Sequence, residues 1–172
     1  MESAASLLAM PRVDAIWASA LFQENLNQLV ELERDRIWCR HGLEHLLDVA
    51  RIMWMRCLEE GIGLDKELVY AAALLHDIGK AAQYVRGIPH DAAGKRIARE
   101  VLEGLPQETA FTEREIDEIC TAIAGHRRSR AGAGALERLL FEADKASRTC
   151  FGCAAADTCN WPDSKKNLAI RL

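Results

Sequence analysis

Residues 72–80 read AALLHDIGK, an apolar run that ends in a histidine, an aspartate, a glycine and a lysine. The four residues before His76 are small or aliphatic, so the run predicts a buried helix. Burying an imidazole and a carboxylate without partners costs on the order of several kcal/mol. A bound cation is one partner that satisfies both His76 and Asp77. The stretch therefore indicates a metal site at the end of a central helix.

The patterning on both sides of this stretch predicts further helices and no strand. Apolar residues recur at helical spacing in residues 13–36, 43–60, 66–75, 92–103, 113–125 and 136–150. Asp65 is a candidate N-cap, Thr112 and Glu115 form a capping-box pattern, and Gly79 is expected to end its helix. Residues 81–89 read as a connector.

We therefore expect an all-α protein, a single helical bundle of about six helices with an irregular, cysteine-containing C-terminal tail. Residues 1–36 are expected to pack an N-terminal helix on the core, residues 37–150 to form the core, and residues 151–172 to form the tail. A chain of 172 residues is long enough to bury such a core as one domain.

Composition narrows the classes of partner. The net charge of −4 gives no support for binding polymeric nucleic acid. The N-terminus has no basic leader, and no stretch approaches the roughly 18 uncharged apolar residues of a membrane span. We expect a cytoplasmic protein without a membrane partner, whose six cysteines are thiols or metal ligands. The oligomeric state is not predicted.

Several more polar residues fall at helix ends or on apolar helix faces, where inward-facing ligands belong. Besides His76 and Asp77, these are His45, His90, His126 and Asp144. In a helical bundle they could converge on one point. Hard divalent cations accept carboxylate and imidazole together, so iron, manganese or magnesium is expected.

The order His45, His76-Asp77, Asp144, with residues 78–80 reading IGK, resembles the HD-domain metal-dependent phosphohydrolase superfamily. The resemblance covers residues 37–148. It implies an all-α fold in which His45, His76, Asp77 and Asp144 hold one metal. The sequence lacks the GYP tripeptide of the branch that degrades cyclic di-GMP.

The same resemblance implies a second metal position. His90 and His126 match the two extra histidines of dinuclear members, in which the aspartate of the pair bridges the metals. The interval from Asp77 to His90 is short for such a member.

The function implied is hydrolysis of a phosphate ester of a nucleotide or related small molecule by metal-activated water. Either a phosphomonoesterase or a phosphodiesterase fits, with Asp77 and Lys80 as catalytic residues. Lys80 resembles the family lysine that meets substrate phosphate. Further candidates for binding a small phosphorylated substrate are His41, Arg127, Arg128 and Arg130. Arginine suits phosphate geometry, but such a run could also be a solvated loop.

Two other functions remain open at this point. The site could serve a non-catalytic metal or redox sensor or an interaction module. Alternatively, His41, Glu44 and His45 fit H-x-x-E-H, a zinc-peptidase pattern. The peptidase interpretation leaves His76, Asp77 and Asp144 without a role.

The tail carries a separate motif. Cys150, Cys153 and Cys159 form C-x2-C-x5-C, and Cys39 is a candidate fourth ligand. Such a cluster could bind zinc or an iron–sulfur cluster. The alternative is a set of buried or surface thiols in a capping tail.

Overall fold

The structure is a computed structural model that describes residues 9–170. The expectations for residues 1–8, including the absence of a leader, lie outside the described part. The described chain is helical without strands, which confirms the all-α fold. Its α-helices are α2 (Pro11–Ala18), α3 (Ala20–Leu32), α4 (Leu43–Glu60), α5 (Lys66–Leu75), α6 (Lys80–Arg86), α7 (His90–Glu103), α8 (Glu113–Gly125) and α9 (Ala135–Ala146). None of the described helices is long and apolar enough to cross a membrane.

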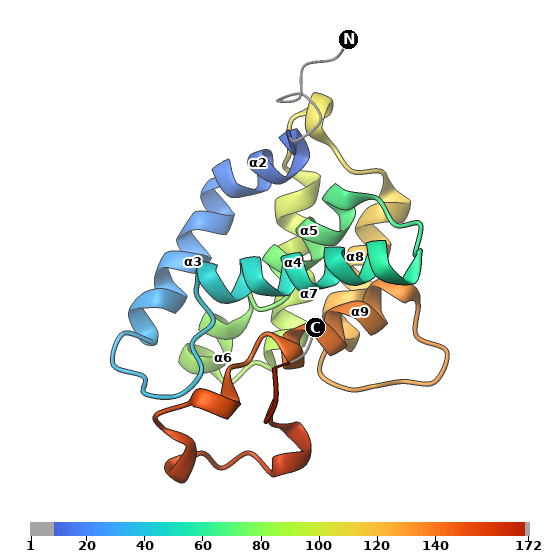
Figure 1. Cartoon of the computed structure of the whole chain (residues 1–172). Coiled ribbons are helices and arrows are strands. Elements are labelled where there is room, and N and C mark those ends of the chain that lie inside the picture. Colours follow the sequence, from blue (N-terminus) through green and yellow to red (C-terminus); the bar gives the residue numbers. More distant parts are fainter. Residues whose placement is uncertain (1–8, 171–172) are drawn as a thin grey trace.

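The central helices have the bounds that the sequence predicts. Asp65 caps α5 by accepting a 3.0 Å hydrogen bond from the Leu68 N–H. Thr112 and Glu115 form the expected capping box at the start of α8. Helix α5 is buried on nearly every side and packs against α4, α8 and α9. In Figure 1, α4 crosses the front of the bundle while α2 and α3 run down one side.

The first predicted helix, residues 13–36, is interrupted. Ser19 adopts an extended backbone with ψ of 125°, so α2 ends at Ala18 and α3 begins at Ala20. Ile16 and Phe22 would point about 120° apart on one continuous helix. The break allows both side chains to be fully buried. Three further boundaries differ: the connector 81–89 is largely helix α6, α7 begins at His90, and α9 ends at Ala146.

Gly79 has a different role from the predicted one. Its φ is −79°, so it does not end a helix in the left-handed conformation. A Cβ at this position would lie 2.2 Å from the His90 carbonyl oxygen and 2.4 Å from the Gly94 nitrogen. Gly79 is therefore needed because the start of α7 packs directly against it. This close approach carries His90 to the end of α5.

The tail after α9 contains three short 3-10 turns, η2 (Cys150–Gly152), η3 (Ala156–Thr158) and η4 (Asp163–Lys165). It folds back across the end of the bundle below α9 (Figure 1). The Trp38 indole N–H donates to the Thr158 hydroxyl at 3.2 Å. The tail therefore reaches the segment that connects α3 to α4.

Candidate metal centre and substrate pocket

Asp77 lies at the centre of two groups of possible metal ligands. Its Oδ2 atom is 3.1 Å from His76 Nε2 and 3.6 Å from His45 Nε2. His45 Nε2 is in turn 3.4 Å from Asp144 Oδ1. One ligand atom from each of these four residues lies within 4.8 Å of all the others. The four residues that the sequence assigned to a first metal are therefore brought together.

The other oxygen of Asp77 faces a second group. Asp77 Oδ1 is 3.5 Å from His90 Nε2 and 3.7 Å from His126 Nε2. The two histidine nitrogens are 3.2 Å apart. Each carboxylate oxygen of Asp77 thus serves a different set of histidines, which is the arrangement of a bridging ligand.

The ends of five helices supply these side chains. His45 lies in the first turn of α4, and His76 and Asp77 lie in the turn after α5. A further histidine begins α7 and another follows α8, while Asp144 lies near the end of α9. All six side chains are buried or nearly so. Because rigid helices converge here, the ligand atoms are positioned before any ion binds.

Backbone carbonyls orient two of the imidazoles. His76 Nδ1–H donates to the Ala73 carbonyl at 2.7 Å, and His126 Nδ1–H donates to the Ile123 carbonyl at 2.6 Å. A carbonyl can only accept, so each Nδ1 must carry the proton. The Nε2 lone pairs are then free to bind a cation beside Asp77.

Side chains orient the other two imidazoles, those of His90 and His45. His90 Nδ1 lies 2.6 Å from Gln83 Oε1. The Ser147 hydroxyl donates to the Asp144 carbonyl at 2.9 Å and lies 3.2 Å from His45 Nδ1. Since that hydroxyl has used its only proton, it accepts from His45 Nδ1–H. Both rings therefore also turn Nε2 inward.

The donor set fits a divalent cation. The buried Nε2 atom of His76 has no hydrogen-bond partner among the described residues. Such an orphaned acceptor is costly unless a ligand satisfies it. The two groups together contain four imidazoles and two carboxylates, the mixed set that divalent iron or manganese accepts. His45, His76, Asp77 and Asp144 would hold one ion, and Asp77, His90 and His126 another.

Both carboxylates are ionised. Burial opposes the charged form of Asp77, but His76, Lys80 and His41 outweigh it and hold its pKa well below the usual range. For Asp144, burial is likewise outweighed, here by the neighbouring His45 and the charge of Arg148, and the pKa is again low. Carboxylate ligands are thus available at neutral pH.

A pocket of about 680 Å³ opens onto these ligands. Lys80 lines it, with Nζ 4.0 Å from Asp77 Oδ1. Arg127 and Arg128, two of the residues predicted to bind substrate, also line it. Arg130 does not. Its guanidinium makes two hydrogen bonds to the buried Glu137 carboxylate, at 2.6 and 2.5 Å, which turns it away from the pocket.

His41 also lines the pocket, but it precedes α4 and is not one turn of a helix before His45. Its Nδ1 lies 2.6 Å from Glu33 Oε1, and its Nε2 lies 3.9 Å from Asp77 Oδ2. Glu44 is exposed. The helical geometry that the zinc-peptidase interpretation needs is therefore not formed.

The cysteines do not assemble into a comparable ligand set. Within residues 9–170, neither group of possible metal ligands contains a cysteine. The four cysteines predicted for this centre are half-buried free thiols: Cys39, Cys150, Cys153 and Cys159. Contact between Trp38 and Thr158 brings their segments together, but not three sulfurs within ligand distance of one another. A metal or iron–sulfur centre here stays a prediction.

Sequence reasoning missed three contributors to the site. Arg148 is buried, and its guanidinium lies 2.9 Å from Asp144 Oδ1 and 3.0 Å from His45 Nε2. Arg148 follows Asp144 by four residues, a spacing that places two side chains on the same side of a helix. This spacing was the signal in the sequence that could have identified it. The other two are Glu33, which orients His41, and the tail, which lines the pocket with Lys165 and Lys166. Neither has a local sequence signature.

Residues 42–149 match the HD domain family, and the chain belongs to that family. An uncharacterized protein from Clostridium beijerinckii is 40% identical over 161 residues, covering 94% of this chain and 99% of its own length. Ribonuclease Y from Nitratidesulfovibrio vulgaris is 33% identical over 105 residues, but the match spans only 18% of that enzyme. The crystal structure of a predicted HD superfamily hydrolase from an uncultured Thermotogales bacterium has a TM-score of 0.58 at 22% identity, covering 85% of this chain and 81% of its own.

Proposed function

We propose that this chain is a metal-dependent phosphohydrolase that cleaves a phosphate ester of a nucleotide or related small molecule. One observation carries the proposal: the two oxygens of Asp77 face two separate histidine groups at the floor of a cationic pocket. Membership of the HD domain family supports the same class of reaction. The open pocket and Lys80 beside the ligands favour this reaction over a sensor that only retains a metal.

The roles of the residues follow from their positions. His45, His76, Asp77 and Asp144 would hold one divalent ion of iron, manganese or magnesium, and Asp77, His90 and His126 a second. A bound divalent ion lowers the pKa of water towards about 7 and so supplies a nucleophile at neutral pH. Lys80 would hold a phosphate oxygen next to Asp77, since its ammonium lies 4.0 Å from that carboxylate.

The pocket supports a nucleotide-sized substrate. Its volume of about 680 Å³ is in the range that binds small ligands. Arg127 and Arg128 offer donors to phosphate oxygens, and Trp161 offers an aromatic face to a base. One relative, ribonuclease Y, is a nuclease by its name. A phosphodiester is therefore the second type of substrate to test. A cytoplasmic location remains a prediction from the sequence.

The test is turnover by protein loaded with manganese or iron. The panel contains nucleoside monophosphates, a phosphomonoester and a phosphodiester of nitrophenol, and a short RNA. Wild type is compared with Asp77→Ala, which removes the shared ligand, and with Asp48→Ala, an exposed aspartate on α4. We expect hydrolysis by wild type and Asp48→Ala only. If the metal-loaded wild type hydrolyses nothing, the sensor function replaces this proposal.

A further inference from the structure

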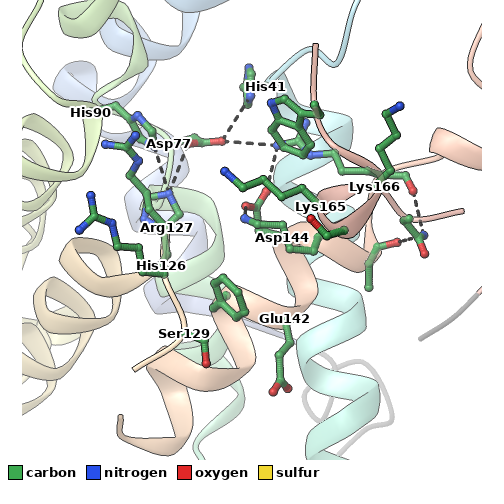
Figure 2. A pocket seen from close by; sticks show the side chains of 18 of the residues that line it. His41, Asp77, His90, His126, Arg127, Ser129, Glu142, Asp144, Lys165 and Lys166 are labelled. Carbon is green, nitrogen blue, oxygen red and sulfur yellow. Dashed lines mark hydrogen bonds and ion pairs between the residues drawn. The ribbon is translucent and has the colours of Figure 1, made fainter. Parts of the chain in front are cut away.

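The pocket is completed by residues that lie beyond the family match. The HD domain match ends at residue 149, whereas five lining side chains come from residues 161–167. They include Trp161, Lys165 and Lys166. In Figure 2, Lys165 and Lys166 lie on one side of the pocket, and His126 and Arg127 lie on the other. The tail therefore builds a wall opposite the arginine loop that follows α8.

A buried amide holds this wall in position. Asn167 is only 6% exposed, and its side-chain amide donates to the carbonyls of Ala146 and Arg148 at 2.9 and 2.8 Å. The backbone carbonyl of Asn167 in turn accepts a hydrogen bond from the Phe151 N–H at 3.0 Å. These bonds satisfy carbonyls at the end of α9 that have no partner within the helix. We call these hydrogen bonds the clamp at Asn167. Lys165 and Lys166 directly precede Asn167 in the chain, so the clamp holds them beside the pocket.

The pocket carries more positive charge than its carboxylates can balance. Among its lining residues, eight are lysine or arginine and three are aspartate or glutamate. Arg128 and Lys165 have no acidic partner among the described residues. Lys166 contacts only Asp163, whose carboxylate is 79% exposed and so screened by water. In a chain with a net charge of −4, such a local excess indicates selection of an anion.

We propose that Lys165 and Lys166 form a second phosphate subsite, and that the substrate carries at least two phosphate groups. This inference rests on the proposed function and names its substrate class. One phosphate would be cleaved at the His–Asp groups beside Lys80, while the tail lysines hold another. A nucleotide with a phosphate chain and one with phosphates on two hydroxyls both meet this requirement.

Binding to metal-free, full-length protein tests the subsite without any need for turnover. The probes are ADP and adenosine 3′,5′-bisphosphate, measured by calorimetry at fixed ionic strength. The double variant Lys165→Gln/Lys166→Gln is compared with Lys95→Gln, an exposed lysine on α7 outside the pocket. We expect the double variant to bind both probes about tenfold more weakly and Lys95→Gln to bind them as wild type does. Equal affinity in all three proteins would overturn the subsite.

Kinetics of the manganese-loaded protein then test the substrate class. The KM for ADP or for the bisphosphate should be about tenfold lower than the KM for AMP. The double variant should raise the KM for that two-phosphate substrate and leave both its kcat and the KM for AMP within twofold. The substrate that shows this preference also tells whether the two phosphates are linked or separate. A KM that rises equally for AMP contradicts the two-phosphate substrate.

The two proposals can fail separately. Weakened binding by the double variant without turnover of any substrate would sustain the anion subsite and refute the hydrolase. Turnover by wild type with unchanged binding in the double variant would support the hydrolase and refute the anion subsite. Thermal melting of each variant checks that weaker binding is not caused by misfolding. We expect the melting temperature of wild type, because Lys165 is exposed and makes no described ion pair.

Discussion

Glu33 accepts two hydrogen bonds from His41, one from the backbone N–H to Oε2 and one from the ring Nδ1–H to Oε1, each at 2.6 Å. The Tyr84 hydroxyl donates to the same Oε1 at 2.6 Å. Burial opposes the charge on Glu33, but these donors outweigh it and lower its pKa to about 2. An ionised, buried carboxylate at the end of α3 therefore aims the His41 Nε2 atom at Asp77.

Replacing Glu33 with glutamine should destabilise the fold without removing a metal ligand. In Glu33→Gln, the new amide NH₂ would face one of the donors of His41 or Tyr84 from which the carboxylate oxygens accept hydrogen bonds in the wild type. We expect a loss of about 1–3 kcal/mol in the free energy of unfolding, measured with urea. Metal content should stay as in wild type, because Glu33 belongs to neither ligand group. The control is Glu31→Gln, an exposed partner of Arg34, which should cost less than about 0.5 kcal/mol. Unchanged stability in Glu33→Gln would show that the pair with His41 contributes nothing.

Metal stoichiometry should distinguish the shared ligand from the others. Asp77→Asn removes charge from both groups, so it should abolish tight binding at both positions and lower turnover more than about 100-fold. Asp144→Asn should affect only the first position and His126→Gln only the second. Elemental analysis after dialysis gives the number of ions retained by each variant. If Asp77→Asn retains as much metal as Asp48→Asn, a control on the surface of α4, the bridging role is wrong.

The sequence predicts the site better than it predicts the pocket. Residues 76–80 and the polar residues at helix ends indicate the six ligand candidates, because helix positions are periodic and ligand types are few, whereas their division into two groups is what the resemblance to the HD-domain superfamily implies. The Ser19 break cannot be read locally, since it arises from the need to bury both Ile16 and Phe22. Gly79 was recognised as special for the wrong reason, because its contacts with His90 and Gly94 are long-range. The tail wall has no helical period at all, and only its fold over α9 brings lysines to the pocket.

The stability of the metal-free protein should fall as the pH drops below about 6.5. Burial lowers the pKa of His41 to about 4 and that of His90 to about 3. In the unfolded chain both rings have an ordinary pKa of about 6.5 and take up protons below it. The unfolded state then binds more protons than the folded one, which favours unfolding. Stability is therefore at its full value above pH 6.5 and declines towards pH 4.

Urea unfolding between pH 7.5 and pH 5 measures this decline. Each ring should contribute on the order of 1–2 kcal/mol by pH 5. His41→Gln and His90→Gln should each flatten the pH dependence in this window, whatever they do to the stability at pH 7.5. A wild-type curve that is level from pH 7.5 to pH 5 would contradict the buried, neutral state of both rings.

Gly79→Ala should damage both the fold and the second ligand group. The added Cβ would lie 2.2 Å from the backbone oxygen of His90, and backbone cannot move aside as a flexible side chain can. We expect a loss of about 3 kcal/mol or more in the free energy of unfolding, with α7 displaced from Asp77. Gly63→Ala is the matched control, since nothing lies within 4 Å of its Cβ position. Equal stability of the two variants would mean that the contact between Gly79 and α7 does not constrain the structure.

The clamp at Asn167 predicts an effect on substrate affinity that a mutation elsewhere in the tail should not produce. Asn167→Ala removes both side-chain donors to the carbonyls of Ala146 and Arg148, so only the backbone bond from Phe151 still ties residue 167 to the start of the tail, and the tail is held less firmly against the end of α9. The ligand groups around Asp77 are untouched, because none of their atoms belongs to the tail. We expect faster proteolysis of the tail and an increase of about tenfold in KM for a two-phosphate nucleotide, with kcat within twofold. Asn160→Ala, at an exposed position that makes no described side-chain hydrogen bond, should leave both unchanged. A fall in kcat with unchanged KM would instead mean that the tail acts on the metal ligands, because only the chemical step would then depend on it.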